Sequence, residues 1–301
     1  MSGSTLAHSR ISAPNWILIF VIGVLWGCSF FFARIAVMEI PPLNLVLFRV
    51  AVAALALHLY LALRGPSFAA ALPMAGAFFL LAMLNNVIPF SLMFAGQTQI
   101  GAGLASVLNA TTPFWTMMLA NAFTEEKLTR RKVTGIVLGI AGTAVMVGPG
   151  VVAGLGGPVW AKFALLGTAL SYGFASIFAA RFKALPPLVI ATGQLTASTI
   201  IMLPVVLLTF GMEGLFSASR DAWMAVLALA LVSTALGYTL FFRVLSSAGP
   251  TNASLVTLIV PVSAILLGVL LLGERLEIFE IAGMALIGLG LVVIDGRLIR
   301  I

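Results

Sequence analysis

Apolar stretches of about twenty residues recur along the whole chain, each long enough to cross a hydrocarbon core of about 30 Å as a helix. The short breaks between them carry proline, glycine or charge, which is typical of turns. The pattern predicts an all-α integral membrane protein with ten transmembrane helices, at residues 16–36, 43–63, 72–95, 100–123, 133–149, 160–180, 188–210, 222–243, 250–272 and 277–295.

The composition of the chain supports this membrane assignment. Of its 301 residues, 61% are hydrophobic and 8% are charged, whereas a soluble domain carries about 25% charged residues. The first apolar stretch, from Trp16 to Ala33, is too long for the apolar part of a signal peptide. We therefore expect it to be retained as the first helix.

The basic residues predict the orientation, because the cytoplasmic loops of membrane proteins carry an excess of Lys and Arg. With the N-terminus inside, eleven of the sixteen basic residues fall on the cytoplasmic side, four on the opposite side, and Arg49 within a helix. Residues 1–15 and 296–301 are then cytoplasmic tails of a multi-pass protein in a bacterial-type inner (plasma) membrane. The same bias accounts for the net charge of +7 without a nucleic-acid partner.

An internal repeat divides the chain. A shift of 148 residues superimposes Gly101 on Gly249, Ala105-Ser106 on Ala253-Ser254, Pro113 on Pro261, Glu126-Lys127-Leu128 on Glu274-Arg275-Leu276, Gly135 on Gly283 and Gly142 on Gly290. Slightly smaller shifts, of 146 and 145 residues respectively, superimpose Trp26-Gly27 on Tyr172-Gly173 and Pro41-Pro42-Leu43 on Pro186-Pro187-Leu188. The alternative is chance among apolar, glycine-rich segments, and one offset that joins glycine, proline and a charged triplet argues against it.

The two repeats, residues 16–149 and 160–295, each contain five predicted helices. Because five is odd, the second repeat starts on the opposite face of the membrane, and the halves are inverted around a central cavity. Inverted repeats are a recurrent plan of secondary transporters, with the solute site near the midplane between the halves.

The motifs within the repeat resemble those of a known family. The run Pro261…Leu271-Leu272-Gly273-Glu274-Arg275-Leu276…Gly283, its twin Pro113…Thr124-Glu125-Glu126-Lys127-Leu128…Gly135, the early Leu25-Trp26-Gly27…Phe31 and Arg49 after Pro42 are similar to the signature of EamA-type transporters of the drug/metabolite transporter superfamily. The resemblance implies a ten-helix carrier of small organic metabolites, closest in character to a bacterial aromatic amino-acid exporter.

Polar and aromatic residues at mid-helix depth are the candidates for a solute site, because polar groups are costly in lipid and tend to face a bundle interior. The residues expected to line the cavity are Trp26, Arg49, Asn85, Asn86, Phe90, Asn109, Thr112, Trp115, Tyr172, Thr234, Tyr238 and Thr257. Aromatic rings with a polar tip suit a wall that stacks on an apolar solute. For each aromatic residue alone, packing against lipid or a neighbouring helix explains the sequence as well.

Three prolines within predicted helices are candidates for kinks near the middle of the membrane: Pro89, Pro113 and Pro261. Each frees the carbonyl four residues earlier, which offers a solute acceptor or a gating bend. The alternative is a simple kink whose carbonyl is satisfied by neighbours.

Arg49 lies about two turns inside the second predicted helix, and two roles are open to it. A fixed cation at that depth can bind a carboxylate with two parallel hydrogen bonds. The resemblance to the EamA-type family, many of whose members carry Arg here, favours a structural link to helix-end carbonyls. Glu274 precedes the last helix, and we interpret it as a cap on the dipole of that helix.

Several chemistries lack the residues they need. No Asp or Glu lies deep in a predicted helix, no phosphate-binding loop occurs, no His/Cys/acid set has metal-ligand spacing, and no nucleophile lies beside a base. We expect no enzyme activity, no catalytic residue, no metal and no cofactor.

The sequence therefore predicts a secondary or facilitative exporter of small organic metabolites, amino acids above all, that works by alternating access. The expected partners are a small-molecule solute and membrane lipid, with the monomer as the functional unit. The alternatives are a carrier of sugars or nucleotide-linked solutes and a lipid-handling membrane protein.

Overall fold

The computed structural model describes residues 13–124, 127–153, 157–209, 217–248 and 256–295, and every regular element within these ranges is a helix. A helix lies at each of the ten predicted segments. The first half contains α1 (Ala13–Val37), α2 (Pro42–Arg64), the 3-10 helix η1 (Phe68–Met74), α3 (Ala75–Ala82), the π-helix η2 (Met83–Val87), α4 (Ile88–Gln97), α5 (Ala102–Asn109), α6 (Thr112–Phe123) and α7 (Arg130–Ala153). The second half contains α8 (Val159–Ala179), the 3-10 turn η3 (Ala180–Phe182), α9 (Pro187–Thr209), α10 (Arg220–Leu227), the π-helix η5 (Ala228–Leu236), α11 (Gly237–Ala248), α13 (Val256–Leu272) and α14 (Ile278–Asp295).

Six continuous helical stretches in the described ranges are long and apolar enough to cross a membrane. They are Ala13–Val37, Pro42–Arg64, Ala71–Gln97, Val159–Phe182, Pro187–Thr209 and Arg220–Phe241, and two shorter apolar helices follow at Ile259–Leu272 and Ile278–Ile294. The all-helical class is thus confirmed, whereas the count of ten membrane crossings stays a prediction.

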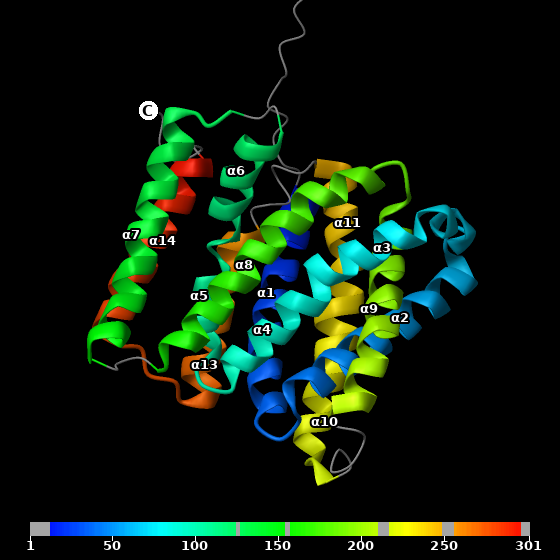
Figure 1. Ribbon diagram of the computed structural model, residues 1–301, viewed down its shortest axis with the longest axis horizontal. Coiled ribbons are helices and arrows are strands. Elements are labelled where there is room, and N and C mark those ends of the chain that lie inside the picture. The colour runs from blue at the N-terminus through cyan, green and yellow to red at the C-terminus, as the bar shows by residue number, and fades with distance from the viewer. Residues whose placement is uncertain (1–12, 125–126, 154–156, 210–216, 249–255, 296–301) are drawn as a thin grey trace, which may run out of the picture.

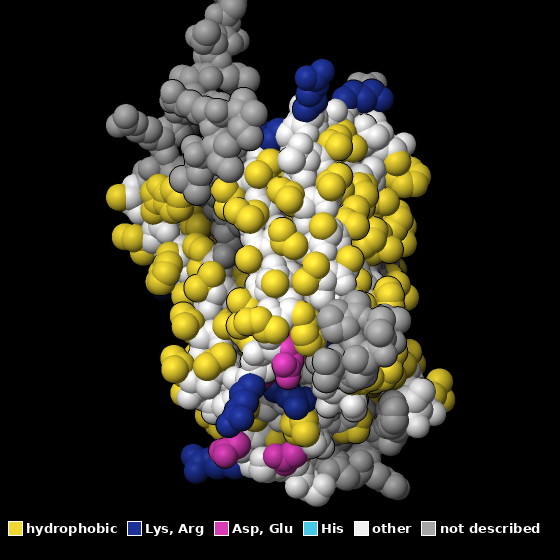
Figure 2. All heavy atoms as spheres, turned by 90° about the vertical axis from the view of Figure 1, so that its left-hand side faces the viewer, with side chains coloured by type: hydrophobic (Ala, Val, Ile, Leu, Met, Phe, Trp, Pro, Cys, Tyr) yellow, Lys and Arg dark blue, Asp and Glu magenta, His cyan; other side chains and the backbone are white. Residues whose placement is uncertain are grey.

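The surface of the molecule is organised as a lipid-facing surface must be. Figure 2 shows hydrophobic side chains across the middle of the side that carries α7 and α14, with charged side chains gathered at its two ends. Val137 and Ile140 on α7 and Leu289 on α14 are each more than half exposed. Because charge is costly inside a bilayer, this distribution places the middle of the helices in lipid.

The helices α7 and α14 lie side by side at one end of the molecule (Figure 1). A Cβ added to Gly290 would lie 2.6 Å from the carbonyl oxygen of Gly135, and one added to Gly142 would lie 2.7 Å from that of Gly283. The two contacts show that the helices run antiparallel. They are also equivalent to each other, because the repeat superimposes Gly135 on Gly283 and Gly142 on Gly290. Small residues let the two backbones approach in the absence of a hydrophobic driving force between helices.

Equivalent contacts tie the first helix of each half to the other half. Gly27 of α1 packs on Ser263 of α13, and Gly173 of α8 packs on the backbone of Thr116 in α6. Gly27 and Gly173 are equivalent in the repeat. The helices that they contact correspond too, because the shift of 148 residues superimposes α6 on residues 260–271 of α13. The contacts between the halves are therefore reciprocal.

Both halves contain a π-helical segment at the same place. The shift of 148 residues superimposes Met83–Val87 on residues 231–235, which lie inside the π-helix Ala228–Leu236. The amide of Ile88 donates to the carbonyl of Met83, and the amide of Gly237 donates to that of Val232, five residues earlier in each case. Such segments interrupt a helix and occur often at functional sites.

The structure breaks the predicted helix 100–123 into α5 and α6, just before Pro113. Proline has no N–H, so the carbonyl of Asn109 cannot receive its helical bond. It accepts one from the Thr112 hydroxyl instead, at 2.7 Å. Pro113 thus begins a helix and its freed carbonyl is satisfied locally, whereas Pro261 lies inside the continuous α13.

Glu274 caps the N-terminus of α5, a contact that we call the Glu274 clamp. Its carboxylate accepts hydrogen bonds from the amides of Ala102 (2.6 Å) and Gly103 (3.0 Å), at the N-terminus of α5. Gly273, with φ +65°, ends α13 in a left-handed conformation that directs the following residue there. A Cβ on Gly101 would lie 2.5 Å from the carboxylate carbon, so this glycine makes room for it. Glu274 is therefore structural, as the sequence interpretation held, but the helix that it caps is α5 rather than α14.

The α7–α14 crossing gives a first prediction. Gly290→Leu places a side chain against the backbone of Gly135, so we expect the free energy of unfolding to fall by about 2 kcal/mol or more. Thermal unfolding in detergent measures it. Gly288→Leu is the matched control on the same helix, because nothing lies within 4 Å of its added Cβ. Equal melting temperatures for the two variants would contradict the crossing described.

The Glu274 clamp gives a second prediction. Glu274→Ala leaves two amides of α5 without their acceptor, which costs about 1–2 kcal/mol. We expect faster hydrogen exchange at residues 102–109, measured by mass spectrometry. Glu277→Ala removes an exposed carboxylate from the same loop and should leave exchange in α5 unchanged. Unaltered exchange in Glu274→Ala would show that the clamp does not stabilise α5.

Candidate functional site

A buried arginine joins the two halves near their centre. Arg49 of α2 is 6% exposed, and its Nε donates to the Thr234 Oγ1 at 3.0 Å. Thr234 belongs to the π-helix η5, and its own hydroxyl donates to the carbonyl of Leu229 at 2.8 Å. One hydroxyl thus serves both the irregular helix and the guanidinium.

Aromatic rings surround this guanidinium. Its central carbon lies 3.8 Å from the ring centre of Phe90 and 5.7 Å from that of Phe94, both on α4. The phenol groups of Tyr172 on α8 and Tyr238 on α11 lie near enough to interact electrostatically with the guanidinium. Cations are attracted to the faces of aromatic rings, so the rings stabilise a charge that lipid would exclude.

The aromatic wall continues to the first helix. Trp26 of α1 meets Tyr238 edge-on, with ring centres 6.2 Å apart, and lies 5.0 Å from the ring of Phe241. A Cβ on Gly237 would come 2.7 Å from the indole nitrogen of Trp26, so this glycine allows the close approach. The structure therefore brings together six residues that the sequence singled out, namely Trp26, Arg49, Phe90, Tyr172, Thr234 and Tyr238.

An equivalent network links α9 to the first π-helix. The Asn85 amide donates to the Gln194 Oε1 at 2.8 Å, and the Asn86 amide donates to the Ser198 Oγ at 3.0 Å. Gln194 follows Arg49 by 145 residues, the shift that superimposes Pro42 on Pro187. The second helix of each half thus binds the π-helix of the other half, with a cation in one case and a neutral amide in the other.

Hydroxyl groups of α8 complete the surroundings of η2. Ser171 donates to the carbonyl of Leu84 at 2.7 Å, and Thr168 donates to that of Pro89 at 3.1 Å. Sequence reasoning missed both residues. They precede Tyr172 by one and four positions, and the spacing of Thr168 from Tyr172 places these two on one helix face, which could have identified Thr168.

Several buried polar atoms of the described residues have no hydrogen-bond partner. They include the Arg49 Nη1, the Asn86 Oδ1, the Asn109 Oδ1 and the Ser233 Oγ. A buried polar group left unpaired costs about 1–3 kcal/mol. The Asn44 Oδ1 and the Gln97 Oε1 are unpaired as well, so three of these six atoms belong to residues that lie on a π-helix or bind one.

The remaining candidates lie on the broken fourth segment and on α13. Trp115 packs near Gly173, where an added Cβ would lie 3.3 Å from its own. Asn109 and Thr112 bond to each other across the α5–α6 break, and Thr257 lies in the first turn of α13. The contacts described for Arg49 include none of these four residues.

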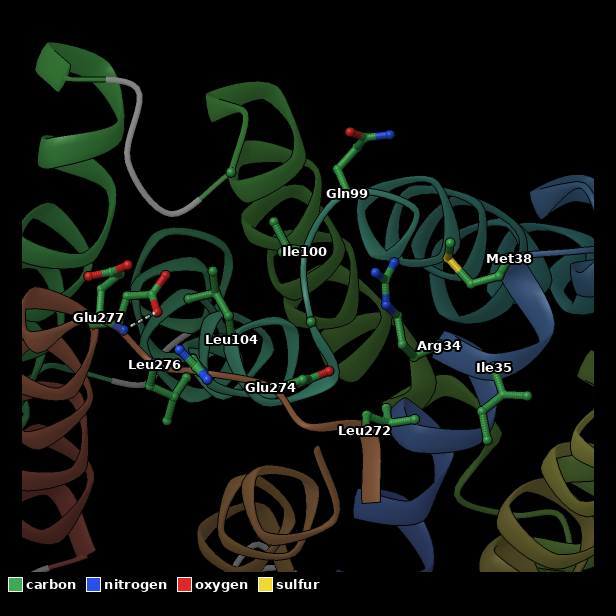
Figure 3. Close-up of a pocket in the computed structure, with 14 residues that line it drawn as sticks. Arg34, Ile35, Met38, Gln99, Ile100, Leu104, Leu272, Glu274, Leu276 and Glu277 are labelled. Carbon is green, nitrogen blue, oxygen red and sulfur yellow. Dashed lines mark hydrogen bonds between the residues drawn. The ribbon is translucent and has the colours of Figure 1, made fainter. Parts of the chain in front are cut away.

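A cavity of about 410 Å³ lies elsewhere, at the end of the molecule that carries the Glu274 clamp. Figure 3 shows Arg34, Gln99, Glu274 and Glu277 around it, from the end of α1, the turn before α5 and the loop before α14. None of the predicted solute-site residues lines it. Its lining carries both basic and acidic side chains, with Arg34 and Arg275 beside Glu274, Glu277 and Glu280.

Two buried charges near this end were missed from the sequence. Lys162 of α8 is fully buried and donates to the carbonyl of Met146 at 3.2 Å. Glu280 of α14 is 3% exposed and accepts from the amide of Glu277 at 3.0 Å. The two charges interact electrostatically. Lys162 lies in the predicted helix 160–180 and was counted only as one of the four basic residues on the side opposite the cytoplasm. For Glu280, the available signal was its spacing from Glu277, which is typical of a helix start.

Several known proteins are similar to this chain over most of its length. The chain is 27% identical over 267 residues to YedA of Escherichia coli strain K12, an uncharacterized inner membrane transporter, covering 89% of this chain and 86% of that protein. It is 27% identical to a probable amino-acid metabolite efflux pump of Salmonella typhimurium, with 93% and 94% covered. It is 26% identical to a probable terminal-alkyne amino-acid exporter of Streptantibioticus cattleyicolor, with 96% and 95% covered.

The fold and the repeat have separate support. A solved crystal structure superimposes with a TM-score of 0.67 at 19% identity, covering 96% of this chain and 100% of that one. The EamA-like transporter family matches twice, at residues 14–148 and 159–295, which together take in nearly all the described helices. With one copy of the family's unit in each half, the chain is a member of the EamA-like transporter family.

Proposed function

We propose that this chain is a secondary or facilitative transporter that exports small organic metabolites, amino acids above all, by alternating access. The observation that carries the proposal is the reciprocity of the contacts between the halves. Arg49 of the first half binds the π-helix of the second, and Gln194 of the second half binds that of the first. Two equivalent sets of contacts allow one half to rock against the other and exchange their conformations.

The membrane arrangement forms part of the same proposal. Ten spanning helices form two inverted halves of five, both termini are cytoplasmic, and the monomer is the working unit in a bacterial-type plasma membrane. The antiparallel α7–α14 contact and the parallel contact of Gly23 and Gly27 with Ile259 and Ser263 support the alternating directions that this topology requires.

The proposed solute site consists of Asn86 of η2 and the cluster of residues around Arg49: Trp26, Arg49, Phe90, Tyr172, Thr234 and Tyr238. Its aromatic rings offer stacking surfaces, and its unpaired polar atoms offer hydrogen bonds that a solute can satisfy. The printed names of two relatives, an amino-acid metabolite efflux pump and an amino-acid exporter, support amino acids as the solute class. The π-helices and the α5–α6 break supply positions at which a helix can bend.

The direct test is counterflow in proteoliposomes that contain the purified protein. We expect saturable exchange of radiolabelled amino acids from a panel of small neutral and aromatic ones, because the site combines rings with hydrogen-bonding groups. Sugars and nucleotide-linked sugars are included as the alternative solute classes. Counterflow of those solutes alone would replace the amino-acid assignment, and counterflow of none would overturn the exporter.

A second experiment tests the site. Tyr238→Ala removes a ring from the wall, and Asn86→Ala removes the bond between η2 and α9, so we expect each to lower counterflow about tenfold with normal membrane insertion. Tyr60→Ala is the control, because Tyr60 is 47% exposed on α2, and its flux should match the unmodified protein. Unchanged flux in Tyr238→Ala and Asn86→Ala would remove both residues from the site.

A further inference from the structure

The guanidinium of Arg49 has hydrogen-bonding capacity that the fold does not use. Its Nε is bound by Thr234, but its Nη1 is buried and has no hydrogen-bond partner among the described residues. No carboxylate within those residues forms an ion pair with it, and its electrostatic neighbours are the phenols of Tyr172 and Tyr238. A buried cation is ordinarily paired, so this one lacks the partner expected for it.

The other half of the molecule shows that the fold does not require a charge here. Gln194 stands at the equivalent place and binds the opposite π-helix through a neutral amide, at 2.8 Å from Asn85. A neutral side chain therefore suffices to link the second helix of a half to the π-helix of the other half. The positive charge of Arg49 needs a reason other than this link.

The surroundings of Arg49 limit what its missing partner can be. A guanidinium is planar, and its fork of N–H donors matches a carboxylate. The cluster contains one cation among the rings of Phe90, Tyr172 and Tyr238, so a phosphate with two negative charges would keep one charge uncompensated. The described contacts of the cluster offer no carboxylate for an ammonium group.

Building on the exporter proposed above, we propose that Arg49 is a specificity-determining residue that binds the carboxylate of the exported solute, and that the site recognises this carboxylate rather than the ammonium group. The solute reaches the guanidinium when the halves open, and its carboxylate supplies the partner that Nη1 lacks. The rings around Arg49 receive the apolar part of the solute. The class of solutes that the transporter binds is then wider than amino acids and includes other monocarboxylates with the same side chain.

Competition in the unmodified protein tests the proposal without any mutation. The probe is the amino acid with the highest counterflow in the panel, and the competitors are the 2-oxo acid and the carboxamide with the same side chain. We expect the 2-oxo acid to compete within about threefold of the amino acid, and the amide at least about tenfold more weakly, as expected for a charge-assisted pair. Equal competition by the amide, or none by the 2-oxo acid, would overturn the proposal.

A variant then assigns the selectivity to Arg49. Arg49→Gln copies the residue that occupies the equivalent place in the other half, so the link to η5 can persist. Its preference for the amino acid over the amide should fall below about threefold, because the charge that distinguishes them is lost. Arg181→Gln is the control, since this exposed arginine also lies over a phenylalanine ring, that of Phe178 at 4.9 Å. A wild-type preference in Arg49→Gln would refute the assignment.

The outcomes separate this inference from the function on which it rests. If no amino acid shows counterflow, the exporter proposal fails. If counterflow occurs and the amide competes as well as the amino acid, the role of Arg49 fails and the exporter stands. Should Arg49→Gln not fold, Arg49→Lys keeps the charge and loses the planar fork, and we expect it to retain the preference for the carboxylate with weaker affinity. Loss of that preference in Arg49→Lys would count against the proposal.

Discussion

The constraint on which this structure depends is that no backbone polar group can be left unpaired in hydrocarbon. A regular helix meets the constraint by itself, so each interruption needs a donor or acceptor from elsewhere in the bundle. Ser171 supplies one to the carbonyl of Leu84, and Thr168 supplies one to that of Pro89. Three polar residues of the π-helices, Asn86, Ser233 and Thr234, are buried in the bundle, where the two halves can supply each other's hydrogen bonds. The polar site lies there for the same reason.

Arg49 shows how this constraint shapes the buried cluster around it. The hydroxyl of Thr234 satisfies a carbonyl of its own π-helix and also receives the guanidinium. A charge is thereby held at depth by one hydroxyl and by the faces of two phenylalanine rings. Each of these interactions is modest, and the guanidinium still retains an unpaired nitrogen. A buried nitrogen without a partner costs free energy until some group satisfies it.

The positions of the helices could be predicted from the sequence, because span length and hydropathy follow directly from the thickness of a bilayer. The repeat could be predicted too, because matching glycines, prolines and a charged triplet recur at one offset along the chain. The π-helix η2 could not be predicted, because the hydroxyl groups that bond to it and to Pro89 just beyond it come from α8, 87 and 79 residues away. The bond between Arg49 and Thr234 spans 185 residues, and Glu274 lies 172 residues from Ala102. Tertiary geometry fixes these pairings, so local pattern alone does not reveal them.

The α7–α14 crossing has a consequence for the origin of the chain. Gly135 of α7 meets Gly290 of α14, and Gly142 meets Gly283, so each half presents the same surface to the other. A self-complementary surface of this kind closes equally well between two separate copies of one half. Two such copies would have to insert into the membrane in opposite directions, which requires an ancestor with little bias in its basic loops. Fusion of duplicated genes would then fix one direction for each copy, and Arg49 and Gln194 would be free to diverge into a charged and a neutral member of one ancestral pair.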